Sequence, residues 1–295
     1  MVDYENYQIV EKYEEVPNIH HIEIYEPDIA QKAQPGQFVI LMSDEVSERV
    51  PLSIADSSKT TITLYILELG VSSAKIAQMK KGDKFYSVVG PLGKPAQIDT
   101  YGTVVLGGGC YGIGAIYPIA KALKEANNRV ITIIEARSEY LLYNMDKLQK
   151  VSDEFFISTS DGSAGENGHV QDVLDRLIKE GYRFDHAKFI GCTYMMMNCS
   201  HITFPYHIPT HVNLNTIMLD GTGMCGCCRV SVGGETKFAC VDGPEFDGHK
   251  VDWNELMKRK SAYLEEEMIT YQKDPHMCQA LRTIYVGDEG VKEEK

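Results

Sequence analysis

The stretch "GTVVLGGGCYGIGAIYPIAKALKEANNRVITIIEAR", residues 102–137, decides how this chain folds. It opens with a continuous apolar run ending in three glycines, which predicts a buried strand. Apolar residues at helical spacing follow over 113–127, and we expect Pro118 to lie in the first turn of that helix. Residues 129–137 read as a second apolar strand. This strand–helix–strand unit predicts a parallel sheet covered by helices on both faces.

The alternation of strands and helices continues to about residue 210. "LLYNMDKLQKVS" (141–152) and "HVQDVLDRLIKEG" (169–181) predict helices, while "EFFISTSDG" (154–162) and the start of "HAKFIGCTYMMMNCS" (186–200) predict strands. We therefore predict that residues 99–210 form an α/β domain with a parallel sheet.

The glycines of the opening stretch indicate a nucleotide site. Gly108, Gly109 and Gly112 would bring backbone N–H groups and a helix N-terminus to a pyrophosphate. Their spacing departs from G-x-G-x-x-G, so a packed strand–helix turn is the alternative. After the second strand, Glu135 could bind the ribose hydroxyls of NAD, whereas Arg137 could receive the 2′-phosphate of NADP. The sequence leaves that choice open.

Residues 1–98 form a different pattern, a run of short β-rich segments about ten residues apart. This spacing predicts a small antiparallel β-barrel, interrupted by one helix at "SSAKIAQMKKGD" (72–83). Within it, "RVPLSIAD" (49–56) would suit a flavin, with Arg49 on the pyrophosphate and the Ser53 hydroxyl near flavin N5. Pro51 would rigidify the entry of the strand.

"GPLGKP", residues 90–95, would let the backbone pass close to a ring system at Gly90.

The segment from 211 to 250 concentrates thiols, because four of the eight cysteines lie within "CGCCRVSVGGETKFAC" (225–240). The spacing of the candidate ligands is D-x4-C-x2-C-x11-C, from Asp220 through Cys225 and Cys228 to Cys240. Plant-type 2Fe–2S sites use C-x4-C-x2-C with a distant fourth cysteine, so the aspartate takes the first ligand position. Glycines around the cysteines favour an iron–sulfur cluster over zinc, which remains the alternative.

Two other side chains in this segment compete as ligands. Cys227 lies between two proposed ligands, where adjacent side chains diverge, and we predict that it is not one. His249 could replace Asp220, but its distance from Cys240 favours a loop role. Residues 251–295 are expected to form a C-terminal helix, "VDWNELMKRKSAYLEEEMITYQ" (251–272), followed by a charged tail.

Composition narrows the class of partner. The chain has 295 residues, 43 % of them hydrophobic, and a formal net charge of −13. That charge, without a long basic run, disfavours nucleic acid and anionic membranes. No N-terminal segment reads as a signal peptide and no apolar run is long enough to span a bilayer. We therefore expect a cytoplasmic protein whose cysteines serve metal or redox chemistry.

The order of barrel, glycine loop and cysteine segment resembles the ferredoxin reductase-like flavoprotein superfamily over about residues 5–270. Its iron–sulfur tail is similar to two subunits: the electron-transfer subunit of dihydroorotate dehydrogenase B, and the small subunit of NADH-dependent ferredoxin:NADP oxidoreductase, which is sulfide dehydrogenase-like. The former would have cysteine where Asp220 stands. The aspartate and "VDGPEFDGHKVDW" (241–253) look like the latter.

The resemblance implies one FAD across the barrel, one 2Fe–2S cluster, and NAD(H) or NADP(H) on the α/β domain. The motifs that match assign Arg49 and Ser53 to the flavin, the three glycines to the dinucleotide and the four donors to the cluster. The chain departs from the family pattern at Ser72 and Ser73 and at Cys192, which are candidates by position. The flavin residues would be Arg49, Pro51, Leu52, Ser53, Ser72, Ser73 and Gly90; the nucleotide residues Gly108, Gly109, Gly112, Glu135, Arg137 and Cys192; and the cluster ligands Asp220, Cys225, Cys228 and Cys240.

The resemblance also implies how the chain works. A hydride would pass from the dinucleotide to FAD, Ser53 acting at the flavin, and single electrons would leave through the cluster. The partner would be a larger subunit carrying FAD and 4Fe–4S clusters, with ferredoxin reached through the complex, which bifurcates electrons in that family. The alternatives are the dihydroorotate dehydrogenase subunit, a self-contained reductase, and a zinc-binding module without turnover.

Overall fold

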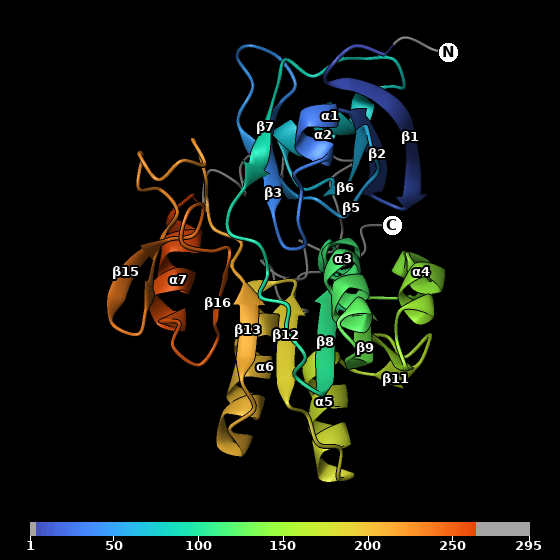
Figure 1. Ribbon diagram of the computed structural model, residues 1–295, viewed down its shortest axis with the longest axis vertical. Helices are drawn as coiled ribbons and strands as arrows, with labels where there is room; N and C mark the ends of the chain where they lie inside the picture. The colour runs from blue at the N-terminus through green and yellow to red at the C-terminus, as the bar shows by residue number, and fades with distance from the viewer. Residues whose placement is uncertain (1–3, 264–295) are drawn as a thin grey trace, which may run out of the picture.

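The structure, a computed structural model, describes residues 4–263, and Figure 1 shows a β-rich unit above an α/β unit, with a third, smaller unit beside the sheet. The β-rich unit contains two antiparallel sheets, with strand orders β1-β2-β6-β5 and β4-β3-β7. Its strands are β1 Gln8–Val16, β2 Ile19–Tyr25, β3 Phe38–Met42, β4 Val50–Ser53, β5 Asp56–Ser57, β6 Thr61–Leu67 and β7 Ser87–Leu92.

The period-2 pattern of these strands builds the core of the β-rich unit. Ile22, Ile24 and Leu64 are fully buried between the sheets, whereas Ile19, of the opposite parity on β2, belongs to the core that contains residues of α3. The helix expected at 72–83 is α2, Val71–Gln78. A second, four-residue helix, α1 (Pro27–Ala30), was not expected; Pro27 at its start supplies a preset φ for the turn.

The α/β unit is a seven-stranded sheet with the order β11-β10-β9-β8-β12-β13-β16, in which every pairing is parallel except that of β16. This confirms the predicted parallel sheet. Its strands are β8 Thr103–Gly109, β9 Arg129–Ala136, β10 Glu154–Thr159, β11 Glu166–Asn167, β12 His186–Ile190, β13 Thr210–Asn213 and β16 Glu245–Asp247; its helices are α3 Gly112–Glu125, α4 Met145–Lys150, α5 Val170–Lys179 and α6 Thr193–Thr203.

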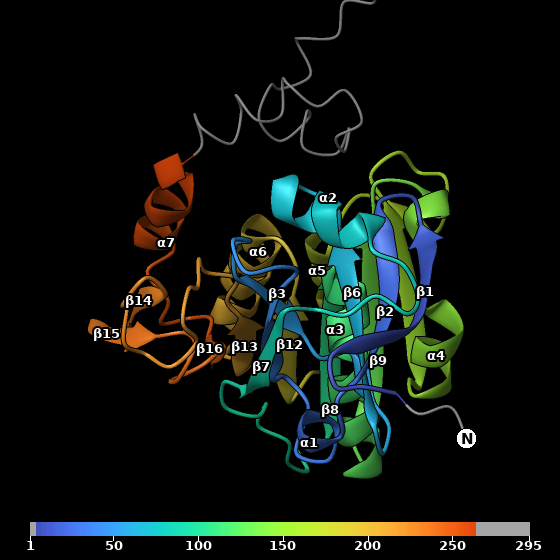
Figure 2. The same ribbon diagram turned by 90° about the horizontal axis from the view of Figure 1, so that it is seen from above.

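Helices cover both faces of this sheet, as Figure 2 shows from above. Val105 of β8 belongs to the hydrophobic core that includes residues of α5 and α6, whereas its neighbour Val104 belongs to the core that includes residues of α3 and α4. Successive residues of one strand thus enter different cores, which is why these strands read as unbroken apolar runs.

Two expectations about the helices are wrong. Pro118 does not lie in the first turn, because α3 begins at Gly112 and Pro118 is its seventh residue. Burial of Ile113, Ile116 and Ile119 stabilises a helix interior that proline alone disfavours by about 3 kcal/mol. The helix expected over 141–152 is shorter, since Asn144 has a positive φ of 59° and α4 begins only after it.

The third unit consists of the hairpin β14 (Arg229–Val232) and β15 (Glu235–Phe238) with helix α7 (Trp253–Lys260). Within the helix expected over 251–272, α7 is followed by a 3-10 turn at Ser261–Tyr263; the rest of that helix and the charged tail lie outside the described residues. The expected boundary at 98/99 falls between β7 and β8, and that at 210/211 falls inside β13.

Among residues 4–263, no helix is long and apolar enough to cross a membrane.

A buried ion pair links the antiparallel edge strand β16 to the parallel part of the sheet. Lys188 of β12 donates to Oε2 of Glu245 of β16 at 2.7 Å, and their side chains are 2 % and 8 % exposed. Oε1 of the same glutamate accepts from the Gln97 amide at 2.9 Å. Burial lowers the pKa of Lys188, so its charge depends on this carboxylate.

We expect Lys188→Met to lower the free energy of unfolding by about 3–5 kcal/mol, because it leaves a buried carboxylate without its cation. The double variant Lys188→Met/Glu245→Gln keeps an acceptor for Gln97 and removes the unpaired charge, so it should recover more than half of the loss. Urea unfolding of both variants measures this. A cost below about 1 kcal/mol for the single variant would contradict a structural role for the pair.

Candidate functional site

Asp220 closes the loop that carries the cysteines. Its Oδ1 accepts from the Thr222 amide at 2.9 Å and its Oδ2 accepts from the Cys225 amide at 2.7 Å. These bonds, that of Thr222 foremost, lower the pKa of Asp220 and keep it charged near neutral pH. Gly221 and Gly223 have φ of 74° and 84°, values that glycine adopts without strain.

Cys228 and Cys240 bring a second pair of donors together. Their Sγ atoms are 3.2 Å apart, and each residue is 1 % exposed within a core that also contains Phe38 and Ile40 of β3. Burial raises the pKa of Cys240 to about 12, so a thiolate there at neutral pH requires a bound cation such as iron.

The four donors fall into two pairs, because the Asp220 carboxylate also contacts the Cys225 thiol. One tetrahedral zinc ion would need all its sulfur donors about 3.8 Å apart, given Zn–S bonds of about 2.3 Å. In the part of the chain that the structure describes, none of these donors belongs to a group of three within 4.8 Å of one another. Two pairs suit two iron atoms with two protein ligands each, so the residues fit a 2Fe–2S cluster.

Of the two competing ligands, His249 lies away from the four donors, whereas Cys227 stays next to one of them. His249 shares a hydrogen bond of 2.8 Å with the Thr203 hydroxyl and packs edge-on against Phe204, so it is held on α6. Cys227 is half-buried; its carbonyl accepts from Arg259 of α7 at 3.0 Å, and its thiol interacts with that of Cys225.

The expected flavin motif lies next to this loop. Arg49, exposed at the start of β4, donates to the carbonyl of Leu219 at 3.4 Å, and Leu219 directly precedes Asp220. Pro51 and Leu52 pair with Ile40 and Val39 of β3, which places the Ser53 hydroxyl at the exposed end of β4. The sequence motif and the cysteine loop, 170 residues apart, are therefore in contact.

The other expected flavin contacts are engaged within the protein. Ser73 accepts from the amides of Leu69 and Gly70 and so caps the N-terminus of α2, while Ser72 donates to Glu48. A Cβ on Gly90 would lie 2.7 Å from Val39, so this glycine lets β7 approach β3 closely.

The residues expected to bind the dinucleotide lie at or just after the carboxyl ends of β8, β9 and β12, and the strand order of the parallel sheet reverses between β8 and β12. In open α/β sheets, the carboxyl ends of strands at such a switch point form a binding crevice. The glycines are needed there for packing: a Cβ on Gly108 would lie 2.7 Å from Ile116, and one on Gly112 only 1.9 Å from the Ile190 carbonyl oxygen. Gly108 and Gly109 are the last residues of β8 rather than part of a loop.

Glu135 lies near the end of β9 and Arg137 directly follows the strand, but the two side chains differ in exposure. Glu135 is buried at 8 %; its Oε2 accepts from the Val170 amide at 2.6 Å and lies 3.5 Å from His169. Its carboxylate thus holds the N-terminus of α5, and its contact with His169 raises the pKa of that histidine. Arg137 is exposed, and among residues 4–263 no ion pair involves it.

Cys192 is the N-cap of α6, and its Sγ accepts from the Met195 amide at 3.4 Å. The residue is exposed, but desolvation by the atoms around its sulfur raises the pKa of this thiol.

A hydrogen-bond network that the sequence did not predict crosses the switch point. Tyr111 donates to the Gly191 carbonyl at 2.7 Å and accepts from Asn215. Asn215 accepts from Thr193 at 3.0 Å, and Lys260 of α7 donates to the same threonine at 2.9 Å. The one sequence signal was the tyrosine inside the glycine-rich stretch. The network links the residues at the switch point to α7 of the third unit.

Comparison with known proteins identifies the family to which the chain belongs. A family model described as the iron-sulfur cluster binding domain of dihydroorotate dehydrogenase B matches residues 215–252, which include all four proposed donors. A Thermotoga maritima protein, named dihydroorotate dehydrogenase B (NAD(+)), electron transfer subunit homolog, is 43 % identical over 90 % of this chain and 94 % of the relative. A probable electron transfer subunit of the same enzyme from Methanocaldococcus jannaschii is 34 % identical over 74 % of this chain and 80 % of the relative.

Solved structures extend the comparison. One, described under flavin-based electron bifurcation via the NADH-dependent reduced ferredoxin-NADP oxidoreductase structure, matches with a TM-score of 0.87 at 41 % identity, over 92 % of this chain and 99 % of the other. The cytochrome P450 reductase GcoB of Amycolatopsis, at 19 % identity and a TM-score of 0.63 over 70 % and 68 % of the chains, shares the fold alone. The fold is thus ferredoxin reductase-like, and the chain belongs to the family of dihydroorotate dehydrogenase B electron transfer subunits and their homologues.

Proposed function

We propose that this chain is the small, electron-transferring subunit of an electron-bifurcating NADH-dependent ferredoxin:NADP oxidoreductase. The observation that carries the proposal is the direct contact between Arg49 of the flavin motif and Leu219 of the cysteine loop. A flavin at β4 and a cluster at the loop would then be close enough for electron transfer without a further carrier. The match to a solved oxidoreductase of that name over 99 % of its chain supports the assignment.

The bound groups supply the redox chemistry: FAD exchanges a hydride with the dinucleotide, and the 2Fe–2S cluster carries one electron at a time. The residues of the chain bind and orient them. Arg49 would neutralise the flavin pyrophosphate, with Pro51, Leu52 and Gly90 shaping the strands beside the ring. The Ser53 hydroxyl would lie near the reacting edge of the flavin. The N–H groups at the start of α2, held by Ser73 beside Ser72, would face the phosphates.

The same proposal assigns the dinucleotide to the crevice between β8 and β12. Gly108, Gly109 and Gly112 would allow its phosphates to approach the start of α3, and Cys192 would lie at the nicotinamide end. At the adenosine end, Arg137 has an exposed guanidinium, whereas the Glu135 carboxylate is largely used by α5.

The cluster would be held by Asp220, Cys225, Cys228 and Cys240. A carboxylate among three thiolates lowers the negative charge density on one iron, and the two amides bonded to Asp220 fix the orientation of its oxygens. The paired arrangement of the donors argues against a zinc-binding module.

Electron transfer subunits imply a larger partner, and the surface around the cluster suits one. Ile217, Leu219, Met224 and Val241 are 41 %, 49 %, 88 % and 37 % exposed, which gathers apolar area at the point where electrons would leave. We propose that this surface binds a subunit carrying FAD and 4Fe–4S clusters, through which ferredoxin is reached.

Thiols 3.2 Å apart would oxidise outside a reducing compartment, which supports a cytoplasmic location.

The second candidate is the electron transfer subunit of a dihydroorotate dehydrogenase, favoured by the family model at residues 215–252. The companion chain decides between the two. Native co-purification that yields a dihydroorotate-oxidising subunit would establish the second candidate and overturn the first.

Cys228→Ser should reduce iron from about two atoms per chain to less than half of that, because it removes a buried cluster ligand, while the FAD content stays unchanged. Iron analysis and the visible spectrum measure both. Cys227→Ser is the matched control, one residue away, and should keep its iron. Unchanged iron in Cys228→Ser would remove this residue from the ligand set.

Asp220→Cys should retain two irons per chain and displace the cluster reduction potential by more than about 50 mV, because ligand identity tunes the potential. A spectroscopic redox titration compares the variant with the parent protein. If the two titrate at the same potential, the aspartate does not bind iron.

Met224→Glu should weaken association with the larger subunit at least tenfold, since it places a charge in the apolar surface. Iron content confirms that the neighbouring Cys225 still binds. Tyr140→Glu, at an exposed aromatic residue on the α/β unit, is the control and should associate normally. Equal affinity of both variants and the parent would place the interface elsewhere.

A further inference from the structure

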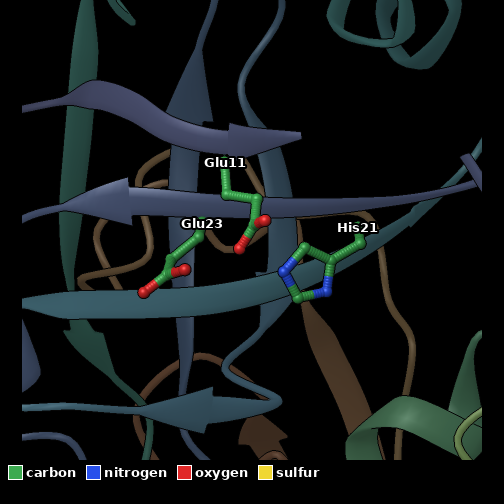
Figure 3. A group of neighbouring side chains, drawn as sticks. All are labelled: Glu11, His21 and Glu23. Carbon is green, nitrogen blue, oxygen red and sulfur yellow. The ribbon is translucent and has the colours of Figure 1, made fainter. Parts of the chain in front are cut away.

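A second group of side chains able to ligate a metal lies on the face of the β1–β2 pair that is turned away from the core of the β-rich unit, and Figure 3 shows its three members, Glu11, His21 and Glu23. One ligand atom from each lies within 4.8 Å of the other two. Glu11 and Glu23 are directly opposite each other in the antiparallel register, and His21 is two residues before Glu23 on the same face of β2. The group is thus built on paired strands rather than on a loop.

His21 is the unusual member of the group. It is 6 % exposed, its Nδ1 is buried without a hydrogen-bond partner, and among residues 4–263 its imidazole makes no hydrogen bond. Tyr13 stacks on the ring with centroids 4.5 Å apart and planes 11° apart, and Tyr65 contacts it edge-on at 5.4 Å. In Figure 3 the other ring nitrogen, Nε2, faces the Glu11 carboxylate. The imidazole is therefore fixed with a nitrogen aimed at two carboxylates.

The two carboxylates lack a cation. Like charges directly opposite each other on a sheet destabilise it. Within the described residues, neither Glu11 nor Glu23 takes part in an ion pair with lysine, arginine or histidine. The Thr61 hydroxyl donates to Oε1 of Glu23 and so orients this carboxylate while leaving Oε2 available. Such an outer hydrogen bond is characteristic of metal ligands.

We propose that Glu11, His21 and Glu23 bind one divalent transition-metal ion of the zinc class. One imidazole nitrogen and two carboxylate oxygens are a donor set that Zn²⁺ accepts, with water completing the tetrahedron on the exposed side of Glu11. Magnesium and calcium prefer oxygen donors alone, so the imidazole selects against them. This site is separate from the cysteine loop, and its existence does not depend on the function proposed above.

The ion would have a structural effect. The β1–β2 ladder has a register irregularity between Ile9 and Glu11, immediately before the site. A metal that binds both strands just after this irregularity would fix their register. It would also hold His21 against Tyr65, which packs on Gly114 of α3, where a Cβ would lie 2.3 Å from the tyrosine ring. The β-rich and α/β units meet at that contact.

The test uses the full chain with its flavin and iron in place, so that the cysteines are occupied, and Zn²⁺ alone as the probe. Calorimetric titration followed by dialysis and metal analysis gives affinity and zinc per chain, and iron is measured in the same samples. We expect one zinc per parent chain with unchanged iron. Glu11→Gln and His21→Gln should each bind zinc at least tenfold more weakly.

Glu14→Gln is the matched control, since Glu14 lies on the same strand, and the amide keeps the acceptor for the Asn18 N–H. It should bind zinc as the parent does. Glu11 is exposed, so Glu11→Gln remains informative even if His21→Gln fails to fold. The proposal is overturned if the parent binds no stoichiometric zinc, or if Glu11→Gln binds it with the parent's affinity.

Discussion

The close approach of the cysteine loop to the sheet that carries the flavin motif is the constraint on which the rest of the molecule depends. Gly221 rests against β3 and β7, and a Cβ there would lie 2.6 Å from Leu92 and 2.8 Å from Ile40. Glycine therefore permits a separation that no other residue permits without displacing the sheet. Because electron transfer falls off steeply with distance, this contact gives the proposed relay its physical basis.

The hydrophobic cores are arranged around that contact. Cys228 and Cys240 lie in the same core as Phe38 of β3 and Trp253 of α7, so the proposed ligands are buried together with residues from two other parts of the fold. The cysteine segment is therefore an integral part of the molecule rather than an appended one. By contrast, Asp220 and Cys225 lie at the surface side of the loop, where a partner could approach.

The sequence allowed us to predict those features of the fold that depend on residues close together in the chain. The apolar strands around residues 102–137 predicted the parallel sheet, and the spacing from Asp220 to Cys240 identified a cluster segment, because such loops are encoded within a few dozen residues. Contacts between residues far apart in the chain could not be predicted from the sequence. The bond of Glu135 to Val170, the contact of Arg49 with Leu219 and the insertion of β16 beside β13 depend on tertiary packing, which overrides local preference. The prediction for Pro118 was wrong for the same reason, because burial of the apolar side chains of α3 outweighs the tendency of proline to break a helix.

The antiparallel strand β16 has an additional consequence. Without it, β13 would end the parallel sheet with its backbone donors and acceptors open to solvent, a template for pairing with another chain. The other edge of the sheet is formed by β11, which has only two residues and so offers little backbone for pairing. The segment that carries the proposed cluster ligands thus also covers the edge of the parallel sheet at β13. Loss of this segment would therefore remove the proposed cluster site and expose a strand edge that favours aggregation.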